Sequence, residues 1–112
     1  MNVRNYKDVP LTEPVAGLTK RVVIGPDVGA ANFIMRIFEL KPGFASPEHS
    51  HHWEHEIYVL DGCGTAMNGA GEKTMIQKGD VIFIPPNERH GLTSTGSVPL
   101  QFICLVPPEG DK

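Results

Sequence analysis

The chain has 112 residues, of which 40% are apolar, 12 are glycine and 10 are proline; this length allows a single domain with its own core. Ten Lys and Arg against 13 Asp and Glu give a formal net charge of −3, which excludes the basic surface that nucleic acids or anionic membranes require. No apolar run approaches the roughly 20 residues that span a bilayer, and residues 1–14 lack the apolar segment of a signal peptide. We therefore expect a cytoplasmic protein with neither a nucleic-acid nor a membrane partner.

The first part of the chain is predicted to be an N-terminal arm followed by a strand. Residues 1–20 are polar and contain Pro10 and Pro14, so we expect an arm with one short strand near 14–18. Residues 20–25 (KRVVIG) are predicted to form the next strand, which ends at the turn-forming residues 26–29 (PDVG).

Residues 32–40 (NFIMRIFEL) form the clearest strand pattern in the first half of the chain. Alternation places Phe33, Met35 and Ile37 on one face, and residues 34, 36, 38 and 40 on the other. We expect the face with Phe33 to be the inner one. The strand ends at Lys41-Pro42-Gly43, a turn by composition.

The second half of the chain consists of short apolar runs separated by turn residues. Strands are predicted at 56–60, 65–67, 73–77, 80–84, 90–93 and 100–106. The second and third of these form a hairpin around Asn68-Gly69-Ala70-Gly71, residues that accept positive φ cheaply. No segment keeps a helical apolar stripe, and strands recur about every 8 to 12 residues, which is typical of sandwiches and barrels. The fold class is therefore all-β, a small antiparallel β-barrel.

Four of the five histidines, His49, His51, His52 and His55, fall within seven residues. Residues at i, i+2 and i+6 of a strand point the same way, so His49, His51 and His55 should share one face and His52 the other. His90 is the only histidine left to complete a shell from a distant strand. Imidazole suits Zn, Cu, Fe and Ni, so these residues predict a metal site.

The spacing of these residues resembles the two signature motifs of the cupins. In the first motif, Gly43 precedes His49 and His51, and Gly62 follows His55 at the family's spacing, although His55 stands where cupins usually have Glu. In the second motif, Gly79, Pro85 and His90 match, whereas Asn87 replaces a Gly and Ser94 replaces an Asn. Asn is the best non-Gly residue for a left-handed position, so Asn87 is a mild change.

The resemblance implies a jelly-roll-like double-stranded β-helix with one divalent transition metal, and residues 21–112 would form this single cupin barrel. The segment HSHHWEHEIYVLDG is similar to compact cupins with a four-histidine site, some of which carry manganese. The implied ligands are His49, His51, His55 and His90, and Mn or Fe is favoured over Zn, Ni or Cu. Glu56 is the alternative fourth ligand, but strand parity places it opposite His49 unless a bulge intervenes. Cupins often pair by strand exchange, so we expect a homodimer that exchanges the arm of residues 1–20.

The favoured function is a mononuclear metal-dependent oxygenase that acts on a small organic substrate. The alternatives are a non-catalytic small-molecule-binding module, a non-redox isomerase or epimerase, and a closed structural zinc site. Cys104 lies within an apolar strand and is predicted to be a buried thiol that lines the cavity, where oxygen chemistry would oxidise it. The other expected wall residues are Phe33, Met35, Ile37, Ile57, Val59, Phe83 and Phe102.

Overall fold

The computed structural model describes residues 1–111 as strands, loops and short 3₁₀ turns, with no α-helix among them. The strands are β1 (Thr12–Val15), β2 (Leu18–Ile24), β3 (Ile34–Leu40), β4 (His55–Asp61), β5 (Cys63–Met67), β6 (Lys73–Gln77), β7 (Val81–Ile84), β8 (Gly91–Ser94) and β9 (Leu100–Val106). The 3₁₀ turns are η1 (Tyr6–Asp8), η2 (Pro26–Val28) and η3 (Pro108–Asp111). Within this described part, no helix is long and apolar enough to cross a membrane.

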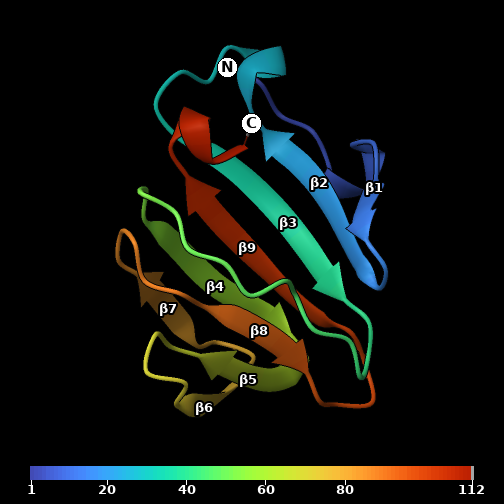
Figure 1. Ribbon diagram of the computed structural model, residues 1–112. Coiled ribbons are helices and arrows are strands. Elements are labelled where there is room, and N and C mark those ends of the chain that lie inside the picture. The colour runs from blue at the N-terminus through green and yellow to red at the C-terminus, as the bar shows by residue number, and fades with distance from the viewer. Residues whose placement is uncertain (112) are drawn as a thin grey trace.

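The strands form two antiparallel sheets. The larger has the order β1-β2-β3-β9-β4-β7, and the smaller has the order β6-β5-β8 (Figure 1). Neighbours such as β3 and β9 are far apart in the sequence, which is typical of a jelly roll rather than a meander. The all-β prediction and the antiparallel barrel are therefore confirmed.

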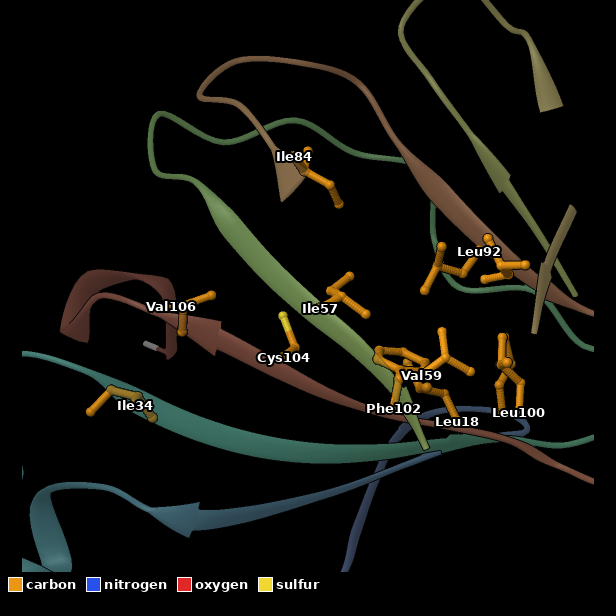
Figure 2. Close-up of a cluster of buried hydrophobic side chains, with 12 residues drawn as sticks. Leu18, Ile34, Ile57, Val59, Ile84, Leu92, Leu100, Phe102, Cys104 and Val106 are labelled. Atoms are coloured by element: carbon orange, nitrogen blue, oxygen red, sulfur yellow. The ribbon is translucent and has the colours of Figure 1, made fainter. Parts of the chain in front are cut away.

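The main core lies between the two sheets. Inward-facing side chains of the larger sheet meet Ile76 and Leu92 of the smaller one, and Figure 2 shows most of this cluster. Leu40, Val59 and Leu100 are fully buried within it. Alternate burial along β9 follows the two-residue period of a strand with one face in the core.

The predicted faces of β3 are wrong. Ile34, Arg36 and Leu40 point into the barrel, whereas Phe33 is 76% exposed. Met35 and Ile37 pack instead on the outside, in a second cluster with Val9 and Val23. The N-terminal arm covers this outer face, so both faces of β3 carry apolar residues and alternation cannot tell which face is inward.

The predicted inward position of Phe83 is also wrong, because that side chain is 58% exposed. In β7 the sequence VIFI is apolar at every position, and Ile84 is the residue that is buried. The other expected wall residues, Ile57, Val59, Phe102 and Cys104, are all buried within the barrel core, but Val59 does not line the cavity beside the histidines.

The short strand predicted in the arm near 14–18 exists but lies slightly earlier, as β1 (Thr12–Val15). Residues 14–18 also contain the turn between β1 and β2, with Gly17 at a φ of +81°. The predicted boundary between arm and barrel, at residues 20 and 21, falls inside β2, which pairs with β3 over its length. Exchange of this arm in a homodimer stays a prediction.

Candidate metal centre

The four histidines of the predicted site, called here the histidine cluster, come from three segments. His49 and His51 lie in the loop between β3 and β4, His55 opens β4, and His90 immediately precedes β8. The sequence predicted that His49, His51 and His55 face the same way because they alternate along one strand. Their rings do lie close together, but only His55 is part of a continuous strand. Contacts with the segment around His90 position the other two.

A backbone bridge joins the two motifs at the site. His49 and His90 form an isolated antiparallel pair, with the N–H of His90 donating to the carbonyl of His49 at 3.0 Å and the reverse bond at 3.2 Å. The N–H of Asn87 donates to the carbonyl of His51, and Asn87 has a φ of +68°. Its left-handed conformation was predicted from the motif and is confirmed.

The ligand atoms of His49, His51 and His90 all lie within 4.8 Å of one another. Two nitrogens bound to one ion at about 2.1 Å each are at most about 4.2 Å apart, so a small closure of the imidazoles suffices. The ring of His51 also stacks on Trp53 at 4.4 Å between centroids, with an interplanar angle of 7°. This contact restricts the rotation of the His51 ring.

His55 lies beside these three histidines at the start of β4, although its ligand atom is not among those within 4.8 Å of one another. Its ring centroid lies 4.9 Å from that of His90 and 5.3 Å from that of His51. Its Nδ1 lies 3.3 Å from Sγ of Cys104, whereas its Nε2 is buried and has no hydrogen-bond partner among the described residues. A buried nitrogen without a partner is costly and fits a missing ligand such as a metal ion.

His90 has the oriented imidazole that metal ligands need. Its Nδ1 lies 2.9 Å from the carbonyl oxygen of Glu88, and donation of Nδ1–H to that oxygen leaves the lone pair of Nε2 free. Together with the unpartnered Nε2 of His55, this arrangement fits a site for a divalent transition metal.

The two alternative residues lie outside the cluster. His52 and Glu56 are both exposed, and Glu56 borders a groove on the outer side of β4 with Tyr58 and Val81. No bulge brings the carboxylate of Glu56 toward the histidines, because β4 pairs with β7 in regular register from His55 to Tyr58. The role of His55 as fourth ligand stays a prediction.

The histidine cluster borders a cavity of about 290 Å³ inside the barrel. Ile57, Phe102 and Cys104 contribute to its wall, as predicted, and Phe38 stacks on Phe102 at 5.4 Å between ring centroids. A larger groove of about 630 Å³ borders β6 and β7, but it contacts His90 alone of the four histidines. The smaller cavity is therefore the candidate binding site.

Arg36 is a residue of the site that the sequence reasoning missed. It is 6% exposed, and Nη2 lies 3.1 Å from Sγ of Cys104, its partner across β3 and β9. The signal was present, because Arg36 is the only charged residue at positions 32–38. A buried arginine needs partners inside the barrel.

Burial lowers the pKa of three imidazoles of the cluster, those of His49, His51 and His55. Burial, aided by the neighbouring histidines, lowers the pKa of His49 to about 4. Burial, His90 and Arg36 likewise lower the pKa of His55 to about 3, and burial lowers that of His51. Neutral imidazole is the form that binds metal. Burial raises the pKa of the Cys104 thiol, so this group is neutral too.

These shifts predict that the metal-free protein loses stability in acid. The unfolded chain takes up protons on histidine near pH 6.5, whereas folded His49 and His55 bind them only near pH 4 and 3. The free energy of unfolding therefore falls as the pH drops from about 6.5 toward 4, by up to about 1.4 kcal/mol per pH unit for each histidine. Urea unfolding of the metal-free protein at a series of pH values measures this slope.

A matched variant assigns the slope. His55→Gln removes one group whose pKa is lowered in the folded chain, so it should flatten the pH dependence relative to wild type. Equal slopes for wild type and His55→Gln would contradict the assignment.

Comparison with known proteins agrees with this geometry. Residues 36–106 match the family described as "Cupin domain". The chain is 41% identical over 61 residues to the uncharacterized protein MJ1618 of Methanocaldococcus jannaschii, covering 54% of this chain and 48% of that protein. It is 25% identical over 93 residues to the tetracenomycin polyketide synthase protein TcmJ of Streptomyces glaucescens, covering 82% of this chain and 62% of TcmJ. The chain thus spans less than two thirds of either relative.

Among solved structures, the chain superposes on the polyketide cyclase RemF from Streptomyces resistomycificus with a TM-score of 0.88. The two are 32% identical, and the match covers 96% of this chain and 80% of RemF. The similarity thus includes both histidine segments and nearly every strand described above.

Proposed function

The chain belongs to the cupin family, and from this premise we propose that it is a metal-dependent enzyme that acts on a small organic substrate. The observation that carries the proposal is the convergence of the histidine cluster on one cavity, with Nε2 of His55 buried and unpartnered. His49, His51, His55 and His90 would hold one divalent transition metal, with Mn or Fe favoured. Imidazole ligands would add no negative charge to the ion.

The residues around the cluster would prepare it for an ion and a substrate. Trp53 would hold the ring plane of His51, and the carbonyl of Glu88 would fix the tautomer of His90. The apolar wall would exclude water from the bound substrate. A bound ion would supply Lewis-acid polarisation of a substrate oxygen and, if redox-active, would support oxygen chemistry.

We favour an oxygenase within this class, because four protein ligands leave up to two positions on a six-coordinate ion. A second candidate is a non-redox reaction such as ring closure, which the similarity to the polyketide cyclase RemF supports. An isomerase or epimerase has weaker support, because Asp111 is the one carboxylate among the described residues that line the cavity.

Elemental analysis followed by oxygen-electrode measurements tests this proposal. We expect about one equivalent of Mn, Fe or another divalent metal per chain, and oxygen uptake with aromatic or enolisable substrates in the metal-loaded protein. Cys104 should then become oxidised during turnover, which mass spectrometry detects. Turnover of such substrates without oxygen uptake would favour the cyclase-type reaction. Absence of bound metal after loading would contradict a metal-dependent enzyme, and metal without turnover would favour a binding module.

A further inference from the structure

Three charged side chains meet at one side of the cavity that the histidine cluster borders. Lys20 comes from β2, Arg36 from β3 and Asp111 from η3, the turn that directly follows β9 (Figure 1). Oδ1 of Asp111 lies 2.7 Å from Nζ of Lys20 and 3.6 Å from Nη1 of Arg36. The Asp111 side chain is only 15% exposed. A carboxylate therefore already sits between two cations inside the barrel.

These cations are not fully satisfied by Asp111. Arg36 is 6% exposed, and its Nε has no hydrogen-bond partner among the described residues. Its remaining polar contacts are a soft thiol sulfur and an ion pair longer than a hydrogen bond. Since a guanidinium has five donors in a fork that matches a carboxylate, Arg36 has free capacity for an oxyanion.

Asp111 is held by its two ion pairs and not by the sheets. Its Oδ1 lies 2.7 Å from Nζ of Lys20, and no hydrogen bond to it is found among the described residues. Asp111 belongs to a four-residue 3₁₀ turn outside the strands, and short turns of this kind open at lower cost than sheets. Displacement of its carboxylate would therefore break the two ion pairs but no strand pairing.

Displacement of Asp111 would leave the cavity with two positively charged side chains, Lys20 and Arg36. Asp111 is the only carboxylate among the described residues that line the cavity. A divalent ion on the histidine cluster would add further positive charge. Without Asp111 the two cations would be left beside each other without a counter-ion, which favours an anion in its place.

We propose that Lys20 and Arg36 form the subsite for the carboxylate of a small organic acid, and that Asp111 occupies this subsite until the ligand displaces it. The apolar wall, including Leu18, Phe38 and Phe102, would contact the body of that acid. This inference deepens the proposed function, on which it rests for the role of the bound acid as substrate. The binding of the acid to the two cations can be measured without metal.

The test is calorimetric titration of the metal-free protein with benzoate and with its neutral isostere benzamide. Because Asp111 competes with the ligand, Asp111→Asn should bind benzoate about tenfold more tightly than wild type, with no gain for benzamide. In the Asp111→Asn background, Arg36→Met and Lys20→Met should each weaken benzoate binding about tenfold or more, since each removes a charge-assisted contact. Lys20 is the less buried of the two, so Lys20→Met keeps the test valid if Arg36→Met fails to fold.

Asp27→Asn is the matched control, because Asp27 forms an ion pair with Arg4 at 3.0 Å on the surface and should leave benzoate affinity unchanged. Equal benzoate affinity in wild type and Asp111→Asn would overturn the proposal, as would an equal gain for benzamide. Metal content is measured separately on the same variants. Failure of the wild-type protein to bind metal, with the expected benzoate affinities, would count against the proposed function alone. Normal metal binding with equal benzoate affinity in wild type and Asp111→Asn would count against the anion subsite alone.

Discussion

Replacing His55 with glutamine is expected to lower the affinity of the protein for Mn²⁺ and Zn²⁺ by more than about a hundredfold, because even outer partners of metal ligands are worth 10- to 100-fold. Nε2 of His55 is buried and has no hydrogen-bond partner within residues 1–111, and the amide nitrogen of glutamine offers no lone pair of comparable basicity. Dialysis against a chelator of known affinity, followed by elemental analysis, measures the change. Circular dichroism of the variant verifies that the barrel still forms.

Two matched variants make this result specific. His52 and Glu56 flank the site in the sequence but are exposed, so His52→Gln and Glu56→Gln should retain metal at the wild-type level. Loss of metal from Glu56→Gln together with retention in His55→Gln would show that the carboxylate is the fourth ligand. The hypothesis of an all-imidazole shell would then be wrong.

Replacing Leu100 with alanine is expected to lower the free energy of unfolding by about 2 to 5 kcal/mol, the range for large-to-small substitutions in a core. Leu100 is 0% exposed and pairs with Leu40, also fully buried, across β3 and β9. The side chain is part of the main cluster (Figure 2), where tightly packed neighbours cannot collapse into the space it leaves. Urea unfolding of both proteins measures the loss.

Leu11→Ala is the control for this substitution, because Leu11 is 51% exposed and the same atoms are removed from the surface. Its effect should stay within about 0.5 kcal/mol. A similar loss for both variants would mean that the unfolded state, rather than the core, accounts for the effect of Leu100→Ala.

Spacing along the chain was enough to predict the barrel and the composition of the histidine cluster. The turns around Gly43, Gly62 and Gly79 all have positive φ, and such turns set strand lengths and register. The predicted inner faces of β3 and β7 were wrong for a common reason. Phe33 immediately precedes β3, and Phe83 lies in β7. Both strands carry apolar residues on both faces, so alternation cannot tell which face is inward.

The charged side of the cavity could not be predicted from spacing. Lys20, Arg36 and Asp111 lie in three different elements, and no motif links them. Each looks like a surface residue when considered alone. Only the pairing of β2 with β3, and of β3 with β9, brings these residues to one end of the barrel.

The bridge between His49 and His90 has a consequence for the order of folding. Four strands, β4 to β7, lie between the two residues in the sequence, so the bridge is a contact of high sequence separation. Closing so long a loop is slow and costly in entropy until other pairings support it. A complete set of imidazoles therefore exists only late on the folding pathway. Metal loading should accordingly slow the rate of unfolding far more than it accelerates folding.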